Sequence, residues 1–135
     1  MLRQSLAASA LAALALLAGG TADEAHACDS WWANHNGSRM KITQCGGALT
    51  ISYARPRSGI RKQGVGSGTL LFDGTIRGNR INGSAAVFRR GCGSAWYPVS
   101  GSMNRAGRIT LYGRAPVRNA NCRVRRMRND TLRFN

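Results

Sequence analysis

From Ser38 onward, hydrophobic and polar residues alternate with a period of two, and glycines interrupt the alternation roughly every eight to twelve residues. The segments 40–43 and 49–53 flank Gly46-Gly47, an arrangement typical of a β-hairpin with a primed turn. A period of two places alternate side chains on one face of a strand, whereas a helix needs a period near 3.6. The pattern therefore predicts antiparallel strands throughout.

Further strands are predicted at 68–72, which Asp73-Gly74 closes, and then at 80–88, 96–101, 108–113 and 122–134. The segment 55–68 is rich in Gly and Arg, contains Pro56 and has no apolar alternation, so we expect a long loop there. About seven or eight short antiparallel strands predict an all-β fold, either a small β-sandwich or a small barrel. The pattern leaves these two architectures open.

Val124 and Met127 interrupt the alternation in the last predicted strand, because they are three positions apart. If both side chains point inward, a β-bulge near Arg125-Arg126 is required. Strict alternation would instead bury Arg126 and Arg128 beside Val124, at a cost in charge desolvation.

Residues 1–27 have the features of a cleaved signal peptide: Arg3, an apolar segment over 6–18, and the small-x-small site Ala25-His26-Ala27. The apolar segment is shorter than the roughly 20 residues that cross a bilayer, so we expect no transmembrane anchor. The prediction is a single all-β domain over 28–135 that is secreted or periplasmic. A lipoprotein modified at Cys28 is less favoured, because no Leu lies three residues upstream.

Four cysteines remain after the signal peptide, and in an oxidising compartment an even number indicates two disulfides. Three pairings are available. We favour Cys28 with Cys45 and Cys92 with Cys122, because each bond then ties neighbouring segments. No metal site or cofactor is expected, since no two cysteines have metal-ligand spacing and His35 is the single histidine of 28–135.

Positive charge dominates the composition, with 20 Lys+Arg against 5 Asp+Glu in the whole chain. Guanidinium groups bind phosphate and carboxylate through paired hydrogen bonds, so the clustered cations are candidates for anion binding. The partner would be an envelope glycolipid, an acidic polysaccharide, nucleic acid or an acidic protein, although no specific nucleic-acid motif is present. The alternative is a generic positive surface, because Arg greatly outnumbers Lys, as a GC-rich coding sequence produces. The candidates are Arg55, Arg57, Arg61, Lys62, Arg89, Arg90, Arg123, Arg125, Arg126 and Arg128.

Catalysis is poorly supported by the residues available. The predicted domain has three isolated aspartates, no glutamate and one histidine, and it has no Gly-x-Ser-x-Gly turn. We therefore expect a protein without enzymatic activity. The alternatives are a small hydrolase or nuclease that uses His35 with an aspartate, and a structural envelope protein or enzyme inhibitor.

Trp32 and His35 are candidates for facing a ligand. Adjacent strand residues point to opposite faces, so one of Trp31 and Trp32 should be in the core and the other exposed as a stacking surface, unless both pack in the core. His35 lies among turn-forming residues. Its alternative role is that of a turn histidine whose ring packs beside Trp32.

Short motifs distributed over 31–134 resemble a small exported bacterial β-rich domain of unassigned activity, which occurs alone behind signal peptides and also appended to the C-terminus of caspase-like peptidases. The resemblance implies a stand-alone accessory domain. It transfers no catalytic residues, because the peptidase Cys and His lie outside this segment. It also implies counterparts of Cys92 and Cys122. The matching motifs include His35-Asn36-Gly37-Ser38, Gly68-Thr69-Leu70-Leu71-Phe72, Tyr97-Pro98-Val99 and Asp130-Thr131-Leu132.

Overall fold

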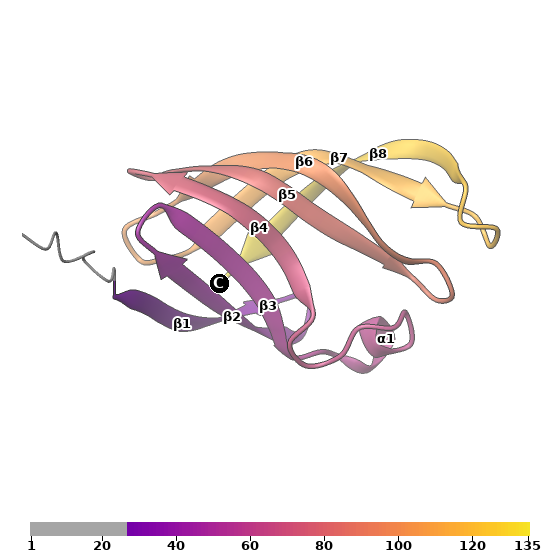
Figure 1. The fold of residues 1–135 in the computed structure, drawn as a ribbon, viewed down its shortest axis with the longest axis horizontal. Coiled ribbons are helices and arrows are strands. Elements are labelled where there is room, and N and C mark those ends of the chain that lie inside the picture. Colours follow the sequence, from indigo (N-terminus) through magenta and orange to yellow (C-terminus); the bar gives the residue numbers. More distant parts are fainter. Residues whose placement is uncertain (1–26) are drawn as a thin grey trace, which may run out of the picture.

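The computed structural model describes residues 27–135, which form eight strands and one helical turn (Figure 1). The predicted signal peptide lies outside the described residues, apart from its last residue. In chain order the elements are β1 (Cys28–His35), β2 (Ser38–Cys45), β3 (Ala48–Arg55), α1 (Ser58–Arg61), β4 (Leu70–Arg77), β5 (Arg80–Arg89), β6 (Gly93–Met103), β7 (Ile109–Arg118) and β8 (Val124–Phe134).

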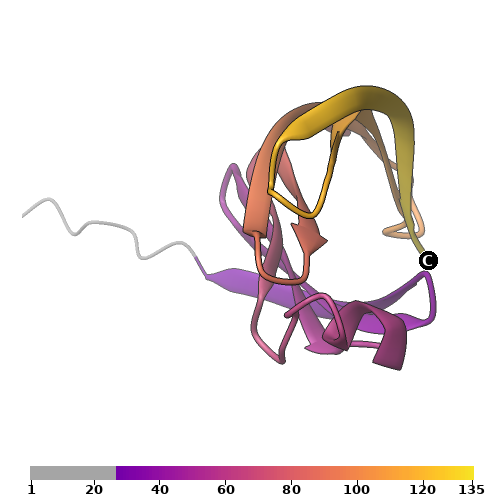
Figure 2. The same ribbon diagram turned by 90° about the vertical axis from the view of Figure 1, so that its right-hand side faces the viewer.

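All eight strands belong to one antiparallel sheet, in which each strand pairs with its neighbour in sequence. The sheet curls until its two ends meet. Asn34 in β1 and Asn135 after β8 exchange two backbone hydrogen bonds, with N···O distances of 2.7 and 3.0 Å. Figure 2 shows this curvature from one end. The predicted all-β class is confirmed, and because the sheet is continuous and its ends meet, we describe it as a small barrel.

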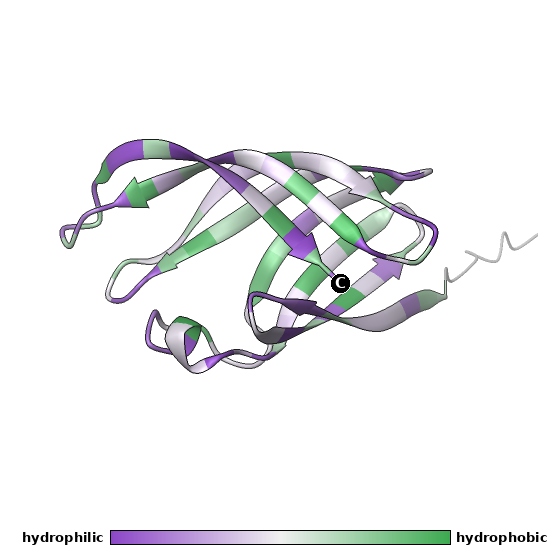
Figure 3. Cartoon of the chain, turned by 180° about the vertical axis from the view of Figure 1, so that it is seen from behind, coloured by the Kyte–Doolittle hydropathy of each residue, from purple (hydrophilic) through white to green (hydrophobic). Residues whose placement is uncertain are grey.

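Alternate residues of successive strands fill the interior, as the period of two predicts. Met40 and Ile42 on β2 and Ile51 on β3 are completely buried, and Ile42 lies opposite Ile51 in the strand pair. The largest completely buried side chains are Phe72 and Phe134. Hydrophobic and hydrophilic positions succeed one another along the strands in Figure 3. Burial of each such side chain contributes about 1.5–3 kcal/mol, so this interior is the main source of stability.

Strand β4 continues past Asp73-Gly74, and the turn predicted there is wrong. The chain turns instead at Gly78-Asn79, where Gly78 has a φ of +60°. Gly74 pairs with Gly83 on β5, and a Cβ atom on either glycine would lie 2.6–2.8 Å from Cζ of Phe72. Gly74 is therefore present because the Phe72 ring covers this glycine pair, not because the chain turns.

The hairpin between β2 and β3 has the predicted primed turn, since Gly46 has a φ of +58° and Cys45 pairs with Ala48 across it. The predicted loop over 55–68 is also present. It contains α1 as its one regular element.

A β-bulge in β8 lies where the sequence suggested one. Val117 on β7 pairs with Arg126, but the next residue, Arg118, pairs with Val124, so Arg125 is an extra residue in β8. The bulge does not turn Val124 and Met127 inward, because both side chains are exposed. The bulge is therefore present although the condition from which it was inferred, inward placement of both residues, is not met.

Both favoured disulfides are present. Cys28 and Cys45 lie directly opposite each other on β1 and β2, and Cys92 is bonded to Cys122. The first bond fixes the start of β1 to the end of β2. Because the Cys28 sulfur is bonded to Cys45, it is not available for attachment of a lipid.

Candidate functional site

The barrel wall is open at one end, between β6 and β7. These strands pair from Met103 opposite Ile109 to Val99 opposite Gly113. Beyond that point β6 runs on to Gly93 paired with β5, and β7 runs on to Arg118 paired with β8. The two hairpins β5–β6 and β7–β8 therefore separate toward their tips.

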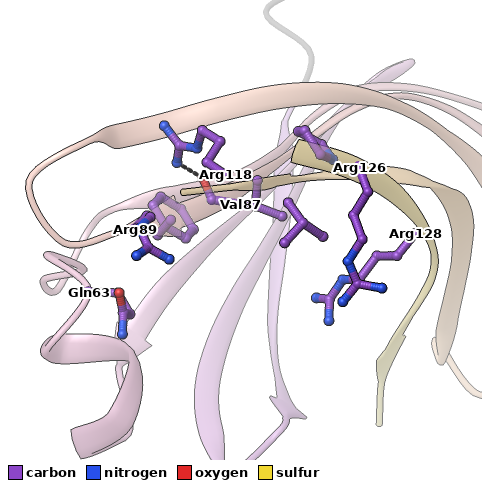
Figure 4. Close-up of a pocket in the computed structure, with 9 residues that line it drawn as sticks. Gln63, Val87, Arg89, Arg118, Arg126 and Arg128 are labelled. Atoms are coloured by element: carbon purple, nitrogen blue, oxygen red, sulfur yellow. Dashed lines mark hydrogen bonds between the residues drawn. The ribbon is translucent and has the colours of Figure 1, made fainter. Parts of the chain in front are cut away.

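Two connections join the separated hairpins. The Cys92–Cys122 disulfide links the turn after β5 to the turn before β8. The Arg118 guanidinium donates hydrogen bonds to the carbonyl oxygens of Val87 (3.3 Å), Cys92 (3.2 Å) and Gly93 (2.7 Å). Figure 4 shows the bond from Arg118 to Val87. These contacts hold the tips of the hairpins at a fixed separation where strand pairing has ended.

Arginines surround the space between the hairpins. One cavity of about 360 Å³ and an adjoining one of about 470 Å³ share Arg89, Val117, Arg118 and Arg126 in their walls. Volumes of this size are typical of ligand-binding clefts. We call the two cavities together the arginine groove. The arginines that line it are Arg89, Arg118, Arg125, Arg126 and Arg128.

The alternation along β8 explains why two of these arginines lie together. Phe134 and Leu132 are buried, and every second residue before them, Asp130, Arg128 and Arg126, lies on the same face of the strand. In Figure 4 the side chains of Arg126 and Arg128 extend from β8 on the same side. Both arginines are exposed because the wall is open here, so they avoid the desolvation cost of a buried charge.

The structure brings together some of the predicted anion-binding residues and leaves others apart. Arg89, Arg125, Arg126 and Arg128 line the groove, and Arg57 lies in a neighbouring cavity. The remaining candidates line neither the groove nor that neighbouring cavity: Arg55, Arg61, Lys62, Arg90 and Arg123.

Arg118 is a groove residue that the sequence interpretation missed. That interpretation ended the strand corresponding to β7 at Gly113, but buried Ala115 continues the alternation toward Val117. This alternation was the available signal. Followed to its end, it would have placed Arg118 at the tip of the hairpin.

A third, more polar cavity of about 200 Å³ adjoins the groove, with Val87, Phe88 and Arg128 in the walls of both. We call it the polar cavity. Its hydrogen-bonding side chains come from β1 and the turn after it, β3, the loop before α1, β6 and β8. They are His35, Asn36, Tyr53, Arg57, Tyr97, Arg128, Asp130 and Thr131.

Two tyrosines in the polar cavity have different partners. The Tyr97 hydroxyl donates a 2.7 Å hydrogen bond to Oδ2 of Asp130. Burial, followed by that hydrogen bond, raises the pKa of Tyr97. Burial also raises the pKa of Tyr53 to about 12, although the Arg57 charge opposes the shift. Both hydroxyls therefore stay protonated at neutral pH.

His35 is the last residue of β1, and it is buried against the end of β8. Its ring stacks on Phe134 with centroids 4.6 Å apart, so the predicted packing beside Trp32 is wrong. Nδ1 lies 2.9 Å from the Arg133 carbonyl oxygen, which requires a proton on Nδ1. Burial lowers the pKa of His35, which favours the neutral ring. His35 faces the polar cavity as a neutral group.

The two adjacent tryptophans separate as the strand alternation predicts. Trp31 packs against the core, whereas Trp32 is exposed, with the Arg39 guanidinium 5.2 Å from its ring centroid. Trp32 lines neither the arginine groove nor the polar cavity. It lines a separate small cavity with Arg39 and Asn135.

No protein-family model, curated protein sequence or solved structure matches this chain. Within residues 27–135, no group of three or more His, Cys, Asp or Glu side chains is placed to hold a metal ion. No helix in the described part of the chain has the length and apolar character needed to span a membrane.

Proposed function

We propose that this protein is an exported, disulfide-bonded, non-enzymatic binding protein that holds an anionic partner in the arginine groove. One observation carries the proposal. The side chains of Arg89, Arg125, Arg126 and Arg128 line one groove, and none of them has a hydrogen-bond or ion-pair partner among residues 27–135. Gathering like charges without counter-ions is unfavourable, and an anion with several oxygens would remove that cost.

The rigid frame of the groove supports a binding role. Arg118 and the Cys92–Cys122 bond fix the separation of the two hairpin tips. A preformed site loses less conformational entropy when it binds its partner. The two disulfides also fit function outside the cytoplasm, where such bonds persist.

The chemistry of His35 supports binding in preference to hydrolysis. A hydrolase of the kind considered above would need an aspartate to orient the imidazole. His35 Nδ1 instead bonds to the Arg133 carbonyl, and the carboxylate of Asp130 accepts from Tyr97. An accessory role is also what the resemblance to the domain appended to caspase-like peptidases implies.

The proposal is tested by titrating the disulfide-bonded protein, residues 28–135, against three polyanions at several salt concentrations. These are vesicles containing a phosphorylated glycolipid, duplex DNA and an acidic polysaccharide. The groove variant is R126Q/R128Q. The matched control is R77Q/R80Q, which removes the same charge from an exposed cross-strand pair at the opposite end of β5.

We expect the groove variant to lose at least about tenfold in affinity at low salt, and the control about two- to threefold. For DNA, removal of two phosphate contacts should lower the slope of log K against log salt by roughly one to two. Equal losses in both variants would identify a generic positive surface and refute the proposal, as would the absence of binding to all three polyanions.

A further inference from the structure

Tyr53 lines the polar cavity, and its hydroxyl group is open to the solvent there. The Tyr53 side chain is only 4% exposed, and its ring meets Phe88 edge-on, with centroids 6.1 Å apart. Among residues 27–135 its hydroxyl has no hydrogen-bond partner. Among the buried side-chain nitrogen and oxygen atoms of the described residues, only Trp31 Nε1 lacks a hydrogen bond, so the Tyr53 hydroxyl is accessible from the cavity. A ligand in the cavity would replace water as its hydrogen-bond partner.

A carboxylate in the same cavity restricts the kind of ligand. Asp130 lines the cavity together with Arg57 and Arg128, and the Tyr97 hydroxyl holds its Oδ2 atom. An ionised carboxylate only accepts hydrogen bonds, and it has room for more than one donor. It repels a ligand that carries negative charge alone. A ligand suited to this cavity therefore presents hydrogen-bond donors beside its anionic group.

From this arrangement we infer that the polar cavity is a subsite for one acidic sugar unit, meaning a sugar ring that bears a carboxylate or a phosphate. The inference rests on the proposed function and deepens it. The anionic group binds Arg128 and Arg57, and ring hydroxyls donate to Asp130 and pair with Tyr53. Because Arg128 also lines the arginine groove, neighbouring units of the same saccharide continue into that groove.

An acidic sugar satisfies the cavity better than other anions do. Polyphosphate offers hydrogen-bond acceptors and no hydroxyl donors. It would therefore place negative phosphate oxygens beside the Asp130 carboxylate without donating a hydrogen bond to it. The side-chain carboxylate of an acidic peptide brings no hydroxyl donors with it. Sugar hydroxyls are both donors and acceptors, and several of them lie on the same ring as the anionic group.

The test uses three soluble ligands that separate charge from hydroxyl donors: oligogalacturonate, its methyl ester and polyphosphate of similar length. Binding is measured by calorimetry at low salt with the wild type, D130N, Y53F and the control R90Q. Arg90 is exposed and lines neither cavity. Y53F removes only the unpartnered hydroxyl. Thermal melting of each variant confirms that it is folded.

Asp130→Asn should have opposite effects on two of the ligands. Loss of the negative charge should tighten polyphosphate binding about two- to fivefold, and loss of the strong acceptor should weaken oligogalacturonate binding about three- to tenfold. Y53F should weaken oligogalacturonate about threefold or more and leave polyphosphate unchanged. R90Q should weaken both ligands equally and slightly. The methyl ester should bind at least tenfold more weakly than the acid.

The acidic sugar could belong to a polysaccharide or to a glycolipid head group. Phosphatidylcholine vesicles that contain a phosphorylated glucosamine lipid are compared with vesicles that contain phosphatidylglycerol at equal charge. If the protein binds the sugar-lipid vesicles more tightly than the phosphatidylglycerol vesicles, and Y53F weakens that binding, the subsite holds a glycolipid head group. If the protein binds oligogalacturonate but shows no preference for the sugar lipid, and Y53F weakens the binding of oligogalacturonate, the subsite holds a polysaccharide unit.

The subsite is refuted if D130N tightens oligogalacturonate and polyphosphate alike, or if Y53F changes no affinity. In that case the proposed function survives, provided that R126Q/R128Q still weakens binding more than R77Q/R80Q does. Failure of the groove variant to differ from its control refutes the proposed function itself.

Discussion

Arg118 donates a 2.7 Å hydrogen bond to the carbonyl oxygen of Gly93, across the gap where β6 and β7 no longer pair. A side chain here performs the role that backbone pairing performs elsewhere in the barrel. Its guanidinium also reaches the Val87 and Cys92 carbonyls, so one residue joins the two hairpins that frame the groove.

Arg118→Gln should lower the free energy of unfolding by about 1–3 kcal/mol, because it leaves partly buried carbonyl groups without their charged donor. Urea denaturation followed by tryptophan fluorescence measures the change. Exposed Arg90→Gln is the control and should lie within about 0.5 kcal/mol of wild type. Equal stability of R118Q and R90Q would show that the Arg118 hydrogen bonds contribute nothing to the free energy of unfolding.

The two disulfides should have different effects on binding. C28S/C45S and C92S/C122S should each lower the stability by about 2–4 kcal/mol, because each removes a cross-link from the unfolded chain. Only C92S/C122S should also weaken polyanion binding, since that bond fixes the hairpin tips beside the groove. Calorimetric titration under conditions where both variants are folded tests this difference. A similar loss of affinity in C28S/C45S would contradict it.

His35 should make stability depend on pH below about 6.5. Burial lowers its pKa in the folded protein, so the unfolded chain, with a histidine pKa near 6.5, takes up the proton first. The neutral His35 ring therefore contributes fully to the free energy of unfolding above a pH of about 6.5. This contribution is lost as the pH falls, because the unfolded chain then binds the proton more strongly than the folded protein does. Urea unfolding between pH 7.5 and 5 should show a decline. His35→Gln should abolish it, and an unchanged slope in that variant would exclude His35 as the cause.

Gly83→Ala should destabilise the barrel by about 1–3 kcal/mol through overpacking. The new Cβ atom would lie 2.8 Å from Cζ of the buried Phe72 ring and 2.7 Å from Cα of Gly74, which is a backbone atom of the paired strand. Gly66→Ala is the matched control, since no atom lies within 4 Å of its Cβ position. Thermal melts of the two variants provide the measurement. A G83A protein as stable as G66A would mean that the Phe72 ring can move aside.

Much of the fold follows from local sequence pattern. Alternation such as Met40 and Ile42, or Ile109 and Leu111, predicts strands because side chains of a strand point to opposite faces in turn. The Gly46-Gly47 hairpin and both disulfide pairings also followed from neighbouring segments. The β4 turn was predicted wrongly because Asp73-Gly74 has the composition of a turn, whereas the position of the Phe72 ring depends on the neighbouring strand.

The sequence by itself determined a period-two, disulfide-linked, strongly basic all-β chain, because alternation, cysteine number and charge are properties of short segments or of composition. Only the tertiary structure decided which cations gather. Arg89 and Arg126 share a groove because β6 pairs with β7 only from Val99 to Met103, and Tyr53 and Asp130 line one cavity because the sheet curls until its ends join. Such contacts depend on where strands separate and how far the sheet bends, which are properties of the whole sheet and not of any one segment.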